Sequence, residues 1–500
     1  METITRAYPT VVPQDLFPRA ARYRALRPGQ GRLKEPRLES PRFEESERHL
    51  QCVWFDPALR PDPLRTVDGE RVLVEHPGIW NLEAGPDFLG AVVEVGPERR
   101  KLQGDVEIHI HPSGWKQHGH HGDPRYRNVR CHVTYFPGKA AEGLLPPGTV
   151  QVSLRDALQG RPEFSFETID VTAYPFATRA TIPPCSTVLT HWTADAKSAL
   201  LDAAGEERLR RKTERLAMRI SEAGPGQALY EELLAALGFK HNKLPFRRLA
   251  SVLPLDVLRN ESGGNVLEAY ALLAGVAGLL PRQVRRSWDR ETRRFVRTVW
   301  DHWWKRKHAW TERGMERAQW RLSGLRPANY PLRRMMAAAH LFASAPPLED
   351  RWAQIAALPA VAAVQAVTQS LAGIEAPYWG RRLGLGGSRQ PRQIALVGGA
   401  RIHAVLVNVF VPFAGARTGV LPSGLLNVIP RDEDNEIVRR TAHFLFGPNH
   451  PPTLYHSSLR RQGLIQVFHD YCLIDRSRCA TCSLPAALRN YGESHPEVQK

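Results

Sequence analysis

One short stretch, Gly104–His111, constrains the fold of this chain more than any other. It alternates polar and apolar residues, and alternate residues of a β-strand point to opposite faces of the sheet. One face then carries Asp105, Glu107, His109 and His111, while valine and isoleucine occupy the other. Every polar position is a potential metal ligand or proton carrier. The pattern therefore predicts a half-buried strand with metal-assisted chemistry on one face.

The composition favours a globular protein with a polyanionic partner. The chain has 500 residues, of which 42% are hydrophobic and 24% charged, which is typical of folded chains with two to four domains. Its formal net charge of +17 favours nucleic acid as the partner. An arginine-rich surface that reflects genome composition alone explains the same charge, so the charge gives only weak support.

Cysteine usage and hydropathy predict a cytoplasmic protein without a membrane partner, and no feature indicates a protein partner. Six cysteines in 500 residues are too few for a disulfide scaffold, and the first residues lack a secretory pattern. The apolar stretch 394–416 is interrupted by Arg401 and His403, which indicates a buried element rather than a membrane span. In a reducing compartment, clustered cysteines are better interpreted as metal ligands.

We expect an α+β fold in four segments. A loose, basic, Pro-rich segment covers residues 1–40, and an α/β domain with a mixed sheet flanked by helices covers 41–175. A mostly helical domain follows at 190–378, and a helical C-terminal region with a cysteine cluster covers 394–490. The Gly- and Pro-containing residues 380–393 look like a linker.

Within the α/β domain the hydrophobic pattern predicts one helix, three strands, a short helix or ordered loop, and a last strand. The helix is expected at 47–54, the strands at 71–76, 88–95, 102–111 and 129–136, and the connection at 115–128.

An acidic site is expected where two of these strands meet. Asp87 stands at the start of the second strand, and Glu107 and His109 lie in the third. Carboxylates on adjacent strands suit a hard divalent cation such as Mg²⁺ or Mn²⁺, and the set predicts phosphodiester chemistry. His118, with Asp123 and Tyr126, is expected to line the same cleft, and Lys116 to contact nucleic acid. Each histidine taken alone is more often part of a polar surface loop.

The order Pro86-Asp87, Glu107, His109 resembles the core of the restriction-endonuclease-like PD-(D/E)XK nucleases. The resemblance implies a nuclease-like hydrolase of DNA or RNA, and it assigns an outer carboxylate to Glu47 on the preceding helix. His109 replaces the usual lysine. It could act as general base, ligate a softer metal such as Mn or Zn, or mark a site that no longer cleaves. Two alternatives stay open: a non-catalytic nucleic-acid-binding or scaffold protein, and a metallohydrolase of a small ester or amide.

A second metal site is expected near the C-terminus, where Cys472, Cys479 and Cys482 stand close together with a CxxC pair. Such spacing predicts a Zn site or an iron–sulfur cluster. Cys185 is the preferred fourth ligand, ahead of His469, Cys52 and Cys131. The layout is similar to that of helicase-associated and CRISPR-associated nucleases of the same superfamily. Three reduced cysteines without a metal remain the alternative.

Two basic segments of the helical region could bind nucleic acid, but ordinary structural roles explain them as well. Arg326 could present its guanidinium to a phosphate, but a helix-capping turn explains the same residues. The Trp- and Arg-rich residues 282–321 could stack bases, although aromatic residues at helical spacing usually form core.

Several blocks together resemble an uncharacterised bacterial family known as domain of unknown function 2851. They are residues 85–88, 104–109, 128–133, 237–242, 325–331 and the late block that contains Cys472, Cys479 and Cys482. The blocks span residues 45–485. The resemblance implies no activity, so the functional prediction depends on the acidic site.

Overall fold

The computed structural model describes residues 12–26, 47–81, 85–161, 164–169, 171, 174, 183–310, 312–323, 325–431, 436–447, 449–472, 479 and 482–498. By its internal contacts the chain forms two compact units, each built from separate stretches of sequence. Unit 1 comprises residues 1–25, 193–439 and 449–466, and unit 2 comprises residues 26–192, 440–448 and 467–500. The expected α+β class is confirmed, because a mixed sheet in the N-terminal part is followed by a mostly helical region.

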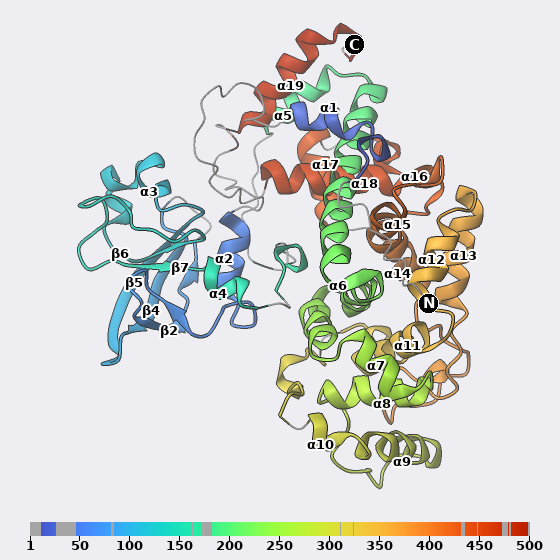
Figure 1. The fold of residues 1–500 in the computed structure, drawn as a ribbon. Helices are drawn as coiled ribbons and strands as arrows, with labels where there is room; N and C mark the ends of the chain where they lie inside the picture. The colour runs from blue at the N-terminus through green and yellow to red at the C-terminus, as the bar shows by residue number, and fades with distance from the viewer. Residues whose placement is uncertain are drawn as a thin grey trace, which may run out of the picture. The chain divides into compact units, whose positions relative to one another are not determined.

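Unit 2 contains a curled seven-stranded sheet in the order β1-β2-β4-β5-β6-β7, with β3 paired to β4 (Figure 1). The strands are β1 Leu64–Arg65, β2 Arg71–His76, β3 Ile79–Trp80, β4 Phe88–Val95, β5 Arg100–His109, β6 Val129–Thr134 and β7 Val150–Ser153. The sheet curls so far that Thr66, just after β1, forms a bridge with Val152 of β7.

The central strands confirm the order expected from the sequence. Helix α2 (Glu47–Phe55) precedes β2, β4 and β5, which pair antiparallel, and β6 then runs parallel to β5. The connection between β5 and β6 consists of the short helix α3 (Gly114–Gln117) and the 3₁₀ turns η2 (His120–Gly122) and η3 (Pro124–Tyr126). A parallel pair needs such a crossover.

Alternation of side chains explains why these residues form strands. In β4 and β5 the apolar residues Phe88, Val93, Val106 and Ile108 are buried. Burial of each such side chain stabilises the fold by ~1.5–3 kcal/mol. Helix α2 buries Leu50, Cys52, Val53 and Trp54, and it packs against β5. The site described below therefore stands on a rigid frame.

Unit 2 also contains α4 (Arg155–Gln159), α5 (Pro184–Thr190) and α19 (Ser483–Ser494). Helix α5 packs against α19, so residues far apart in the sequence share one core.

Unit 1 is helical. Its helices are α1 (Ala20–Ala25), α6 (Ala194–Val252), α7 (Leu255–Ser262), α8 (Val266–Val276), α9 (Arg290–Trp304), α10 (Lys307–Trp310), α11 (Pro331–Ala343), α12 (Leu348–Ile355), α13 (Ala360–Ala372), α14 (Gly399–Val405), α15 (Val411–Thr418) and α16 (Leu425–Val428). Two further helices, α17 (Glu436–Phe446) and α18 (Ser458–Val467), cross the unit boundaries. Glycines let α6 and α18 touch backbone to backbone, because a β-carbon on Gly205 would lie 2.2 Å from the Leu459 carbonyl oxygen.

Two segments that we expected to be loose are held in place by specific contacts. Within residues 1–40, α1 is ordered because Ala20 and Tyr23 are buried and Arg19 pairs with Glu206. The expected linker at 380–393 is held by the buried Arg333, which donates hydrogen bonds to the carbonyls of Trp379, Arg382, Ile394 and Ala395. The rest of residues 1–40 lies largely outside the described part of the chain.

One stretch among the described residues, Gly399–Thr418, is long and apolar enough to cross a membrane by length and composition. It contains α14 and α15, and 67% of its most apolar window is buried inside the protein. Burial on this scale is typical of a core helix.

A candidate metal centre at the end of strand β5

The last residues of β5 bring two polar side chains into the interior of unit 2. Glu107 and His109 alternate with Val106 and Ile108, and only 6% of Glu107 and none of His109 is exposed. The other polar residues of the pattern point elsewhere. The register between β5 and β6 shifts next to Asp105, whose carboxylate accepts a hydrogen bond from the Gly90 N–H of β4. His111 lies past the end of β5 and stacks on Phe136.

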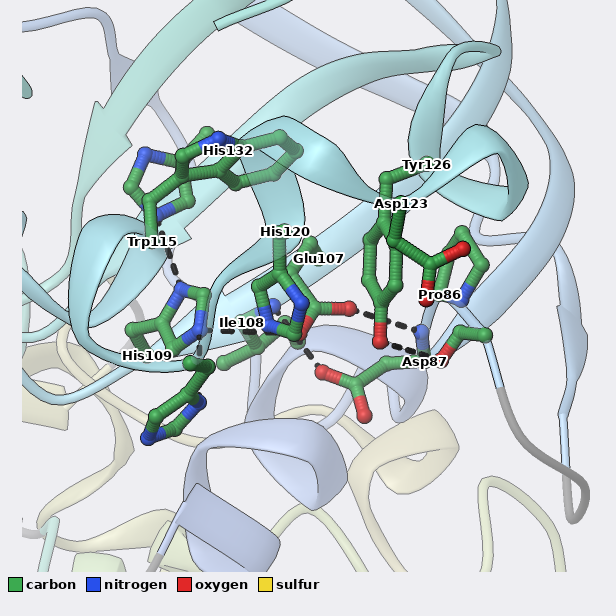
Figure 2. Close-up of polar contacts among 12 residues, drawn as sticks. Pro86, Asp87, Glu107, Ile108, His109, Trp115, His120, Asp123, Tyr126 and His132 are labelled. Carbon is green, nitrogen blue, oxygen red and sulfur yellow. Dashed lines mark hydrogen bonds and ion pairs between the residues drawn. The ribbon is translucent and has the colours of Figure 1, made fainter. Parts of the chain in front are cut away.

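The crossover after β5 adds two more imidazoles. His118 ends α3, and the left-handed Gly119 (φ 73°) then turns the chain so that His120 begins η2. Positive φ costs glycine little. Only 5% of His120 is exposed, and Figure 2 shows its ring, His109 and the Glu107 carboxylate pointing toward one another.

Three imidazoles converge at this point, and the Glu107 carboxylate lies beside two of them. Glu107 Oε1 lies 3.0 Å from His120 Nε2 and 3.5 Å from His109 Nε2, and His109 Nε2 lies 3.1 Å from His118 Nδ1. The ligand atoms of the three histidines all lie within 4.8 Å of one another. Ligands ~2.1 Å from a tetrahedral ion are roughly 3.4 Å apart, which is close to the 3.1 Å between His109 Nε2 and His118 Nδ1. Within the described residues no other His, Cys, Asp or Glu group of three meets the same spacing.

His132 on β6 orients His109 from behind. Its Nε2 lies 3.0 Å from His109 Nδ1, because β5 and β6 are parallel and place Glu107 opposite His132. Burial lowers the pKa of His132 to about 4, although an interaction with Gln151 acts to raise it. His109 Nδ1 and His132 Nε2 share one hydrogen bond, and in one of the two tautomers the proton sits on His109 Nδ1 and is donated to His132. The lone pair of His109 Nε2 then faces the centre, as in metal sites whose histidines are fixed by a second partner.

Aromatic side chains form the wall of the site. Trp115 is fully buried and donates its indole N–H to the Leu144 carbonyl at 2.9 Å. Tyr126 stacks on His120 with ring centroids 3.9 Å apart, and its hydroxyl donates to the Gly85 carbonyl. Burial, together with the charges of Glu107 and Asp87, raises the pKa of Tyr126 well above its ordinary value. The phenol therefore remains protonated and keeps its hydrogen bond to Gly85.

Asp87 lies beside this centre, at the start of β4. Its backbone N–H donates to Glu107 Oε2 at 3.1 Å. Its carboxylate accepts one hydrogen bond from the Ile108 N–H at 2.9 Å and another from Gln51 of α2 at 2.6 Å. The structure thus brings Asp87, Glu107, His109 and His118 together.

The other expected residues have different positions. Glu47 lies one helical turn before Gln51, on the same side of α2. It is Gln51 that connects α2 to the site, through its hydrogen bond to Asp87. Lys116 is exposed on α3 next to the site. Asp123 caps η3 by accepting from the Arg125 N–H. Its hydrogen bonds with the Arg125 guanidinium, and then that backbone bond, lower its pKa to about 2. Arg326 is exposed in unit 1, at the start of the turn Pro327–Asn329.

All four cysteines of the expected site belong to unit 2, and the thiols of Cys185, Cys479 and Cys482 are near enough to interact. Cys185 lies in the first turn of α5, and Cys482 caps α19, which packs on α5. Burial raises the pKa of the Cys185 thiol to about 12, and the nearby thiols of Cys482 and Cys479 contribute. Cys472 ends the described stretch 449–472. The Zn or iron–sulfur site stays a prediction.

Reasoning from the sequence missed His120, His132 and Gln51 as members of the site. The spacing His118-Gly-His120 was the available signal, since two histidines around a glycine can turn toward one ion. His132 and Gln51 carried no local signal, because strand pairing and helix packing place them.

A family model described as "Protein of unknown function (DUF2851)" matches residues 47–419. The match begins at the first residue of α2 and ends at Gly419, just after α15, so the late cysteines lie beyond it. No curated protein and no solved structure matches the chain.

Proposed function

Since the chain belongs to the DUF2851 family, whose description carries no activity, the site itself must indicate the function, and we propose a metal-dependent hydrolase of nucleic-acid phosphodiesters. One observation carries the proposal: the ligand atoms of His109, His118 and His120 lie within 4.8 Å of one another, with the Glu107 carboxylate 3.0 Å from His120 Nε2. The order of helix α2, three antiparallel strands, a crossover and a parallel strand supports it, because restriction-endonuclease-like cores share that order.

The donor set favours a different ion from the one that two carboxylates would select. Imidazole nitrogens suit Zn²⁺ and other transition ions, whereas Mg²⁺ prefers oxygen. We therefore propose Zn²⁺ or Mn²⁺ as the resident ion. When bound, such an ion supplies Lewis acidity to a phosphoryl oxygen and acidifies water.

The remaining chemistry falls to residues of the chain. Glu107 offers the negative charge that offsets a cation in a buried site, and the Asp87 N–H orients its carboxylate. The Asp87 carboxylate is held by Ile108 and Gln51 at a place where it can accept a proton from water. The exposed Lys116 can bind a phosphate next to the site.

The test is cleavage of fluorescein-labelled DNA and RNA, single-stranded and duplex, by the purified full chain. The protein is first stripped with chelator and then given Zn²⁺, Mn²⁺ or Mg²⁺. We expect cleavage with Zn²⁺ or Mn²⁺ and its loss in Asp87→Ala and His120→Ala. His121→Ala is the matched control, because this exposed neighbour is not part of the donor set.

Cleavage that persists in His120→Ala, or no cleavage with any of the three ions, would overturn the proposal. Binding without cleavage by a well-folded, metal-loaded protein would instead identify a nucleic-acid-binding protein that keeps the fold.

A second candidate is a metallohydrolase of a small ester, which the three imidazoles with one carboxylate favour, since Zn hydrolases commonly use nitrogen-rich sites. Turnover of p-nitrophenyl phosphate or p-nitrophenyl acetate, without cleavage of any polynucleotide, would decide for this candidate.

The proposal also includes a cytoplasmic location and a second, structural metal. The thiols of Cys185, Cys479 and Cys482 interact, and we propose that they and Cys472 bind Zn²⁺ or an iron–sulfur cluster. Thiolates of this kind persist as metal ligands under reducing conditions.

A further inference from the structure

Helix α9 of unit 1 carries a row of cationic side chains on its outer face. Its inner face buries Thr292, Val296 and Val299, which recur at helical spacing. The exposed residues on the opposite side recur with the same period. We define the α9 stripe as Arg290, Arg294, Arg297, Trp304 and Lys305, all exposed.

The charge of the stripe is not neutralised within the described chain. At the start of α9, Asp289 and Glu291 pair instead with Arg382, at 2.9 and 2.7 Å. Asp301 is the one acid on the stripe itself. Among the described residues no carboxylate forms an ion pair with the four cations of the stripe. The four cations and Asp301 together leave a net charge of +3 on this face of the helix.

Trp304, the aromatic residue of the stripe, is far more exposed than Trp310 and Trp320. Trp303 packs on Gly275 of α8, and Trp310 and Trp320 are 7% and 5% exposed, as core residues are. Trp304 is 56% exposed, and the Lys307 ammonium lies 4.2 Å from its ring centroid. An exposed indole beside cations is the arrangement on which nucleobases stack while phosphates pair with arginine.

We propose that the α9 stripe binds a single-stranded segment of nucleic acid, with phosphates on Arg290, Arg294 and Arg297 and a base on Trp304. From Arg290 to Trp304 the helix rises about 21 Å, which is long enough to contact several successive nucleotides. The inference rests on the proposed function only in choosing nucleic acid among polyanions. It adds a binding surface in unit 1 that is separate from the metal centre.

The experiment is fluorescence anisotropy of the full chain with labelled 20-nucleotide DNA and RNA single strands, and with the duplex, across a salt series. We expect Arg294→Gln/Arg297→Gln to weaken binding at least tenfold. It should lower the slope of log K against log salt by about 1.4, at ~0.7 per lost phosphate contact. Trp304→Ala should weaken single-strand binding about tenfold without changing the slope, and Trp304→Phe should retain most of it.

The matched control is Arg22→Gln/Arg439→Gln, which removes two exposed charges from unit 1 outside the stripe. It is expected to leave the slope unchanged. An equal effect of both double variants would overturn the proposal, since binding would then follow net charge alone. Duplex binding equal to single-strand binding and insensitive to Trp304→Ala would overturn it as well.

Two further arms separate this proposal from its neighbours. His120→Ala should bind single strands like the unaltered chain. If the unaltered, metal-loaded chain binds single strands through the stripe but does not cleave them, only the metal-centre proposal fails. Co-sedimentation with phosphatidylserine vesicles that is lost in both stripe variants, without nucleic-acid binding, would assign the stripe to an acidic membrane and overturn the proposal.

Discussion

A β-carbon on Gly114 would lie 2.7 Å from the His109 ring, so only glycine leaves room for this imidazole in its observed position. Gly114 opens α3, the first element of the crossover. The fit between the two residues couples the end of β5 to the loop that carries His118 and His120.

Gly114→Ala is expected to displace His109 and to destabilise the protein by about 1–3 kcal/mol, as overpacking of a core does. Zn²⁺ affinity should fall in parallel. Urea unfolding and a competitive zinc titration measure the two effects. Gly122→Ala is the control, because no atom lies within 4 Å of a β-carbon there. Equal behaviour of both variants would show that His109 does not depend on Gly114.

Glu107→Gln is expected to change stability in opposite directions with and without metal. The carboxylate is only 6% exposed and lies beside imidazoles, so a buried negative charge without a cation is costly. The glutamine variant should equal or exceed the parent in melting temperature after chelation. The parent should gain more on adding Zn²⁺, about 2.7 kcal/mol at a hundredfold excess over Kd. Thermal unfolding in both conditions checks this, and a variant that gains as much as the parent would exclude Glu107 as a ligand.

The cysteine site predicts a second bound metal. Cys479→Ser/Cys482→Ser should lose metal that His120→Ala retains, and the reverse should hold for the metal of the histidine centre. Elemental analysis for Zn and Fe, with an absorption spectrum for an iron–sulfur cluster, gives both quantities. Equal metal content in the parent and the cysteine variant would show that the thiols bind no metal.

Acid sensitivity of unit 1 should depend on Glu232 of α6. Burial raises the pKa of this carboxyl, but Arg215 and Arg247 outweigh it and hold the value at about 2, with hydrogen bonds of 3.3 and 2.8 Å. Because the folded pKa lies below the unfolded one, the stabilisation is complete above pH ~4.5 and is lost as the pH falls toward 2. It amounts to about 3 kcal/mol.

Urea midpoints at pH 7 and pH 3 measure this dependence. Glu232→Gln should be less stable than the parent at pH 7 and should lose less on acidification. Glu222→Gln is the control, since Glu222 is 61% exposed in its pair with Arg219. A pH dependence in Glu232→Gln identical to that of the parent would contradict the prediction.

Strand positions were predictable from the sequence, but the composition of the site was only partly so. The alternation in residues 71–76, 88–95 and 129–134 reflects which faces are buried, and β2, β4 and β6 begin where it predicts. The same alternation placed Asp105 beside Glu107, whereas a bulge of β4 between Phe88 and Ala91 brings the Gly90 N–H onto the Asp105 carboxylate. Local pattern does not encode such a bulge.

The histidine cluster shows the other limit of the sequence. His118 and His120 meet His109 because a left-handed glycine reverses the chain between them, and His132 arrives through the parallel pairing of β6. Gln51 reaches Asp87 from α2. These placements depend on tertiary packing, which no window of neighbouring residues contains.

The interleaving of the two units has a consequence for biosynthesis. Helix α5 emerges from the ribosome early, but its packing partner α19 is made roughly 300 residues later, some 15–60 s at common elongation rates. During that interval the apolar face of α5 and the thiol of Cys185 lack their native neighbours. The nascent chain thus passes through a stage in which a chaperone, or early delivery of metal, would protect unit 2 before its last segment is translated.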